Sequence, residues 1–190
     1  KGDIIMNISY KIVALFILTF SFMNAQVRIA ADLGGDHTLS AEGETVTWDT
    51  EMGFSIGYEN MFSENAGVGV EYQLERAVSE AGQEGGKFGF TSVYGVGKFD
   101  LGGLYAFARG GYALVYDGDT AYKGDSDGSL ELSGGLMYGF GAGYNVNDNM
   151  AVEGGYYVNN GEAKVSAFGE SFTMDLEYSR IGVGLVYKLK

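Results

Sequence analysis

Apolar and polar residues alternate with a period of two along almost the whole chain after residue 26. This period is typical of β-strands whose two faces meet different surroundings. It predicts eight strands, at 27–35, 52–59, 66–75, 88–99, 104–116, 130–144, 150–159 and 172–189. In the eighth, the apolar positions change from even to odd numbers near Ser179 and Arg180, which predicts a β-bulge there.

The predicted connections differ in length. Long, polar and acidic segments occur at 36–51, 76–87, 117–129 and 160–171, and short ones at 60–65, 100–103 and 145–149. An even number of strands with tight turns at one end and long loops at the other is typical of a bacterial outer-membrane barrel.

The two faces of the predicted strands differ in side-chain size. In 138–144, glycines at 139, 141 and 143 alternate with Tyr138, Phe140 and Tyr144. An eight-stranded barrel has an interior just wide enough to be filled by side chains, so small residues fit it better than eight sets of large ones. We therefore place the apolar face toward lipid, and with it Phe88, Phe90, Tyr94 and Val96 of the fourth strand. The predicted fold is all-β, an eight-stranded antiparallel up-and-down transmembrane β-barrel.

The first 25 residues predict a signal peptide. Lys11 precedes an apolar stretch at 12–22, about half the roughly 20 residues of a membrane-spanning helix, and Ala25 offers a small residue for cleavage. Residues 1–5, which precede Met6, are grouped with this segment. The expected division is a signal peptide at 1–25 and a barrel at 26–190, with export to the bacterial outer membrane.

The composition excludes several classes of function. Twelve basic and 25 acidic residues give a formal net charge of −13, which disfavours nucleic-acid binding. The chain has no cysteine, and its one histidine, His37, leaves few metal or catalytic constellations possible. The absence of proline suits long, uninterrupted strands.

Four segments carry a resemblance to a known family. These are "NAQ" at 24–26, "LYAFARGGYALVY" at 104–116, "GAGYNVNDNMAVEGGYYV" at 141–158 and "YSRIGVGLVYKLK" at 178–190. Together they resemble the small eight-stranded outer-membrane barrels of the OmpA/OmpX type, also grouped as porin-family proteins. The resemblance implies the architecture far more than an activity.

Charged residues on the small-residue face predict a polar network in the lumen. Its members are Arg28, Asp32, Glu59, Glu71, Arg109, Glu131 and Glu153, with Glu75 on the same face. Acids outnumber bases in this set, and we expect Glu71 to meet Arg109 near mid-strand. Lys98 would face lipid in this register, so either it reaches the short-turn rim or the fourth strand is out of phase. The network is interpreted as a structural seal, with a charge-lined conduit as the alternative.

The acidic segment 117–128 offers oxygen ligands of the kind calcium prefers, from Asp117, Asp119, Asp125 and Asp127. It lacks the glutamate at the twelfth position of an EF-hand, where Gly128 stands. A solvated acidic turn is the simpler interpretation, and calcium is the weaker hypothesis. His37, Ser40 and Glu42 could form a hydrolase triad only if a flexible loop brought them together.

The sequence therefore predicts a non-enzymatic, monomeric outer-membrane barrel with a structural or surface-interaction role. A narrow channel for small solutes is the alternative, and a lipid-modifying enzyme is less favoured. The expected partners are outer-membrane lipid, the barrel-assembly machinery with periplasmic chaperones, and an extracellular ligand at the acidic loops.

Overall fold

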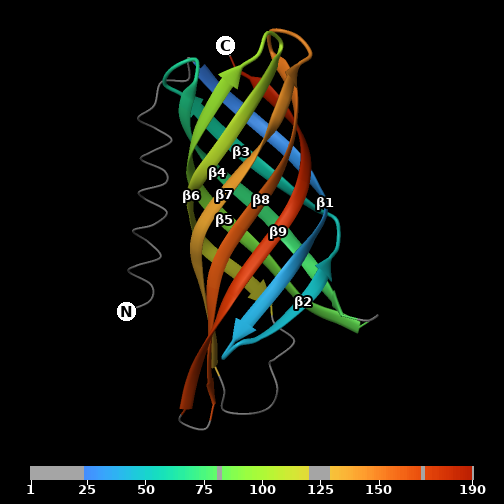
Figure 1. The fold of residues 1–190 in the computed structure, drawn as a ribbon, viewed down its shortest axis with the longest axis vertical. Helices are drawn as coiled ribbons and strands as arrows, with labels where there is room; N and C mark the ends of the chain where they lie inside the picture. The colour runs from blue at the N-terminus through green and yellow to red at the C-terminus, as the bar shows by residue number, and fades with distance from the viewer. Residues whose placement is uncertain (1–23, 81–82, 120–128, 168–169, 190) are drawn as a thin grey trace.

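The computed structural model describes residues 24–80, 83–119, 129–167 and 170–189, and these form a single antiparallel sheet of long strands (Figure 1). The strands are β1 (Ala25–Ala41), β2 (Glu44–Thr50), β3 (Gly53–Met61), β4 (Ala66–Glu80), β5 (Gln83–Asp100), β6 (Leu104–Asp119), β7 (Ser129–Asn145), β8 (Met150–Ala167) and β9 (Glu170–Lys188). Within these residues, no helix has the length and hydropathy that crossing a membrane requires.

The sheet closes on itself. β1 pairs with β9 from Gln26 opposite Lys188 to Ser40 opposite Asp175, and every other pairing along the chain is antiparallel between neighbours. β2 and β3 share one position in the ring, because the two halves of β1 pair with β2 and with β3 in turn. The nine strands therefore make eight positions, and the predicted eight-stranded up-and-down barrel is confirmed.

The strands extend well beyond their predicted ends on one side of the barrel. The predicted long connection at 36–51 is wrong, because β1 continues to Ala41 and returns as β2 through a tight turn. Glu42 and Gly43 form that turn with positive φ angles of 51° and 90°. The connections at 76–87 and 160–171 also consist largely of strand, whereas the short turns lie where they were expected.

The outer face carries an apolar belt, and the lumen takes the small residues of β7. Phe140 and Tyr144 are 59% and 56% exposed, whereas Gly139 and Gly143 point inward and are buried. This is the arrangement that the glycine alternation predicts.

The predicted facing of two strands is wrong. On β5, Phe88, Phe90, Tyr94 and Val96 are buried in the lumen rather than exposed to lipid. On β9 there is no bulge at Ser179 and Arg180: its register with β8 is continuous from Glu170 to Tyr187. The irregularity of this region lies in β1, between Asp32 and Gly34.

Candidate functional site

Among the residues that the structure describes, nine charged side chains meet inside the barrel. They come from seven of the strands: Arg28 and Asp32 on β1, Glu59 on β3, Glu71 and Arg76 on β4, Lys98 on β5, Arg109 on β6, Glu153 on β8 and Arg180 on β9. Eight of them are at most 3% exposed, and the side chain of Lys98 is 11% exposed. Five bases face four acids, so the cluster is nearly balanced in charge.

The part of the cluster nearer the short turns centres on Arg109. Its guanidinium lies 2.7 Å from a carboxylate oxygen of Glu59 and 2.7 Å from one of Glu153. The ammonium of Lys98 contacts the same two carboxylates at 3.2 and 3.4 Å. The Arg109 guanidinium also lies 4.2 Å from the centre of the Phe107 ring, a cation–π distance.

The part nearer the long strand ends alternates in sign. Glu71 accepts hydrogen bonds from Arg28 and from Arg180, the latter at 2.6 Å. Arg180 also lies 3.1 Å from Asp32, which in turn accepts a bond from Arg76. Because Arg28 is 3.5 Å from Glu153, the two parts form one continuous chain of ion pairs along the lumen.

Tyrosine hydroxyls complete the coordination of these charges. Tyr105 donates to Glu153 at 2.9 Å and Tyr94 donates to Glu59 at 3.2 Å, while the Tyr157 hydroxyl accepts from Arg28 at 3.0 Å and from Arg109 at 3.2 Å. A charge in a low-dielectric interior is tolerated only when it is paired and hydrogen-bonded. The cluster meets that condition at its centre.

The glycines of β7 make room for these tyrosines. A Cβ atom at Gly143 would overlap the ring of Tyr105, and one at Gly139 would overlap the ring of Tyr157. Both rings project from neighbouring strands, β6 and β8, across the face of β7. The alternating glycines are therefore sockets for aromatic rings, not simply small residues in a narrow interior.

Apolar and aromatic side chains pack among the charges and beyond them. Phe107, Ala151 and Val186 form one buried cluster with Tyr105 and Tyr157, the two tyrosines whose hydroxyls bond to Glu153 and Arg109. Toward the long strand ends, a second cluster consists of Phe88, Phe90, Ala113, Ala163, Leu176 and Tyr178, with Leu39, Leu132 and Met174 packed against it. The lumen is therefore filled by charges with aromatic rings among them, and beyond these by an apolar cluster.

The comparison with protein families decides what kind of protein this architecture belongs to. A family model described as the outer membrane protein beta-barrel domain matches residues 12–188. The chain belongs to this family.

The chain is also similar to several solved structures. Neisserial surface protein A is 16% identical, with a TM-score of 0.58, and the match covers 87% of this chain and 97% of that one. Ail of Yersinia pestis is 15% identical over 87% and 100% of the two chains, with a TM-score of 0.42. The outer-membrane protease OmpT of Escherichia coli is 11% identical over 90% and 98%, with a TM-score of 0.46. No curated protein matches the sequence.

The structure brings together six of the seven residues proposed for the lumen network of this family member. Glu131 lies on β7, but its side chain is outside the described residues. The expected pairing of Glu71 with Arg109 is not the one formed, because Glu71 lies between Arg28 and Arg180. Glu75 is exposed, since an irregularity of β4 between Gln73 and Arg76 turns it outward.

Sequence reasoning misses three of the five bases. The alternation of apolar and polar residues in the sequence places Arg76 in a loop and Arg180 at a bulge. It places Lys98 on the lipid-facing side of its strand, whereas its side chain points into the lumen. Of the two possibilities stated for Lys98, the strand being out of phase is the one found, because its ammonium contacts two lumen carboxylates. The excess of acids over bases that was expected in the lumen is therefore not found among the side chains that the structure describes.

The metal and triad hypotheses have different outcomes. Asp125 and Asp127 lie outside the described residues, as do the side chains of Asp117 and Asp119, so calcium binding there stays a prediction. The described residues contain no cluster of three potential metal ligands.

His37 lies in β1, 6% exposed, and packs 4.6 Å from the Phe88 ring, whereas the Ser40 hydroxyl pairs with that of Thr45. The segment around His37 is therefore strand, and the flexible loop expected there is wrong.

Proposed function

We propose that this chain is a non-enzymatic outer-membrane protein whose barrel is sealed and whose extended strand ends make contacts outside the cell. The observation that carries the proposal is the filled lumen. A continuous chain of ion pairs has buried aromatic rings packed among its charges, and a buried apolar cluster follows it toward the long strand ends. Water and ions crossing the barrel would have to displace both.

The proposal is tested by conductance of the refolded barrel in planar bilayers. A sealed lumen gives no single-channel steps at protein-to-lipid ratios at which a porin, used as the positive control, conducts. Reproducible steps from the barrel that persist after repurification would support the alternative, a narrow channel for small solutes.

The position of His37 supports a non-enzymatic role. Its side chain points inward against Phe88, while Ser40, three residues along the same strand, points to the other face. Nucleophile and base must lie within hydrogen-bonding distance of each other, which opposite faces of a strand prevent. A lipid-modifying activity through this pair is therefore not favoured.

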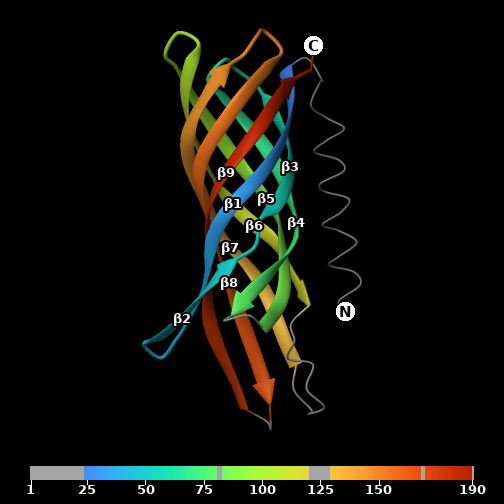
Figure 2. The same cartoon turned by 90° about the vertical axis from the view of Figure 1, so that its right-hand side faces the viewer.

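The surface role rests on the hairpin of β1 and β2. Only Asp49 and Thr50 of β2 pair with β4, so residues 44–48 have no second strand neighbour within the described part of the chain. Figure 2 shows the hairpin turned aside from the ends of β7, β8 and β9. In this family the short turns face the periplasm, which puts the hairpin outside the cell. A free strand edge can accept an extended segment of a partner protein.

Shortening the hairpin tests this role. Thr38 and Thr47 lie opposite each other, with their hydroxyl oxygens 3.1 Å apart, so an Asn-Gly turn can replace residues 39–46 between them. Proteoliposomes carrying the shortened barrel should bind cell surfaces less than those carrying the full hairpin. Equal binding by two barrels that both migrate as folded species would contradict the surface role of β2.

A further inference from the structure

The chain of ion pairs in the lumen ends at Arg76, and part of this guanidinium makes no hydrogen bond. Arg76 lies on β4 and is only 3% exposed. Its Nη1 group donates to Asp32 and, at 2.6 Å, to the Tyr178 hydroxyl. Its Nε and Nη2 groups have no hydrogen-bond partner in the described part of the chain. Because a buried donor is costly when it is unpaired, these two groups favour binding of a ligand.

The two groups lie on one edge of the guanidinium. Their N–H bonds run side by side in its plane, which is the geometry in which arginine binds both oxygens of a carboxylate. The rest of the guanidinium is packed against the barrel. The ring centres of Phe88 and Tyr178 lie 6.0 and 5.1 Å from its Cζ atom, and a Cβ atom added at Gly53 would overlap it. A ligand at the free edge therefore lies in the plane of the guanidinium.

A second donor lies near this edge. Ser55 is 2% exposed, and its hydroxyl has no hydrogen-bond partner among the residues that the structure describes. Ser55 and Gly53 both point into the lumen from β3, two positions and about 7 Å apart. Since the Arg76 guanidinium lies over Gly53, the Ser55 hydroxyl faces the same part of the lumen. A ligand that satisfies both groups is a hydrogen-bond acceptor.

The charges around Arg76 indicate that this acceptor is an anion. From Arg28 to Arg76, the chain of ion pairs contains three guanidinium groups and only two carboxylates, those of Glu71 and Asp32. The rest of the cluster pairs two bases with two acids. Arginine does not lose its proton in proteins, so the surplus charge persists at any ordinary pH. Water would satisfy the free N–H groups without balancing this charge, whereas one monovalent anion does both.

We propose that the Nε and Nη2 groups of Arg76, together with the Ser55 hydroxyl, bind one small monovalent anion such as formate or chloride. The anion extends the alternation of signs by one position beyond Arg76 and makes the buried cluster neutral. A divalent anion would reverse the imbalance, and a bulky one does not fit a group that is 3% exposed. The site belongs to the lumen and does not depend on the surface role of the hairpin.

Urea unfolding of the barrel in phosphatidylcholine bilayers tests this site. Sodium formate or sodium chloride replaces sodium gluconate, whose anion is large, at constant ionic strength. A ligand that binds only the folded state raises the folding equilibrium constant in proportion to its concentration once the site is nearly saturated. We therefore expect up to a tenfold increase for each tenfold rise in formate or chloride. A response to formate alone identifies a carboxylate site, and a response to chloride alone identifies a halide site.

Three variants separate this site from general effects of salt. Arg76→Gln should abolish the dependence on the anion, and Ser55→Ala should require more anion for the same increase. Lys164→Gln removes an exposed cation on β8 and should keep the full dependence. Equal dependence in the parent and Arg76→Gln, or none in the parent, would overturn the proposal.

A direct measurement on the parent barrel decides the matter if Arg76→Gln does not refold. Crystals grown in sodium bromide should show an anomalous scattering peak within hydrogen-bonding distance of the Arg76 Nε and Nη2 atoms. Density at this position without an anomalous signal would mean a water molecule and would refute the anion site.

Discussion

Replacing Arg109 by methionine should destabilise the barrel strongly. Methionine keeps most of the side-chain length while removing the cation that contacts both Glu59 and Glu153 at 2.7 Å. Glu59 would then keep only Lys98, at 3.2 Å, while Glu153 would keep Lys98 at 3.4 Å and Arg28 at 3.5 Å. Arg28 is already paired with Glu71, so the two carboxylates would be left with too little positive charge.

The magnitude follows from the hydrogen bonds that the Arg109 guanidinium makes. It donates charge-assisted hydrogen bonds to Glu59 at 2.8 Å and to Glu153 at 2.7 Å, and each such bond contributes about 1.5–3 kcal/mol. Removing one partner of a buried ion pair typically costs about 3–5 kcal/mol, because the other charge remains buried. We therefore expect the free energy of unfolding to fall by about 4 kcal/mol. Adding Glu153→Gln should recover part of this loss, since it removes the uncompensated carboxylate.

Urea unfolding of the barrel refolded into lipid bilayers measures this change. Trp48, the only tryptophan, reports on the β1–β2 hairpin through its fluorescence, and the heat-dependent gel shift reports on the whole barrel. Lys164→Met is the control, because Lys164 is an exposed cation on β8. A loss below about 1 kcal/mol for Arg109→Met, with the barrel still folded, would show that the ion-pair chain does not hold the lumen together.

Two further predictions concern the glycine sockets and the buried histidine. Gly143→Val should prevent refolding or lower the free energy of unfolding by several kcal/mol, because its side chain would overlap the Tyr105 ring. In the control Gly97→Val, no heavy atom lies within 4 Å of the added Cβ, so its free energy of unfolding in urea should stay within about 0.5 kcal/mol of the parent value. Equal effects of the two substitutions would refute the socket. His37 lies beyond the apolar belt, and its burial lowers its pKa from 6.5 to about 4, so the unfolded chain binds the additional proton between these values. The free energy of unfolding should be highest above pH 6.5 and should fall by up to about 3 kcal/mol as the pH drops from 6.5 to 4. In the same titration, the free energy of unfolding of His37→Phe should depend less steeply on pH.

The fold could be predicted because most strands of the barrel follow one physical rule. Strands with a small inner face and a bulky outer face recur along the chain, and the short turns fall where polar residues interrupt the alternation. The site was harder to predict, because a lumen network depends on which other strands each side chain contacts across the interior. Glu71 contacts β1 and β9 rather than β6, and neither spacing nor residue type indicates that choice.

Strand-by-strand assignment of faces fails for β5 because the interior is shared. The side chains of all eight strands together have to fill the barrel interior, so a single strand can contribute more or less than its share. Glycines on one strand leave space that bulky residues of another occupy, as Tyr94 of β5 does over Gly69 of β4, where an added Cβ would come within 2.7 Å of its ring. The apolar even positions of β5 therefore point inward, and Lys98 follows them into the lumen.

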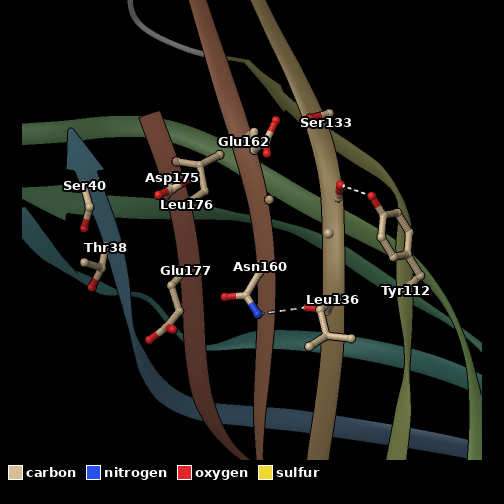
Figure 3. Close-up of a pocket in the computed structure, with 13 residues that line it drawn as sticks. Thr38, Ser40, Tyr112, Ser133, Leu136, Asn160, Glu162, Asp175, Leu176 and Glu177 are labelled. Carbon is tan, nitrogen blue, oxygen red and sulfur yellow. Dashed lines mark hydrogen bonds between the residues drawn. The ribbon is translucent and has the colours of Figure 1, made fainter. Parts of the chain in front are cut away.

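The phase change in β9 is real, and its cause is a change of solvent. Near the short turns, Ile181 and Leu185 face outward, 58% and 53% exposed, as residues in contact with lipid do. Toward the far end, Leu176 and Tyr178 point inward, 4% and 1% exposed, within the apolar cluster that fills the lumen there. The backbone register does not change between them. The apolar positions move from the outer to the inner face where the surroundings of the strand change from lipid to water. This change occurs beside Glu177, whose side chain is exposed (Figure 3), and it marks the place where the outward apolar residues of β9 end.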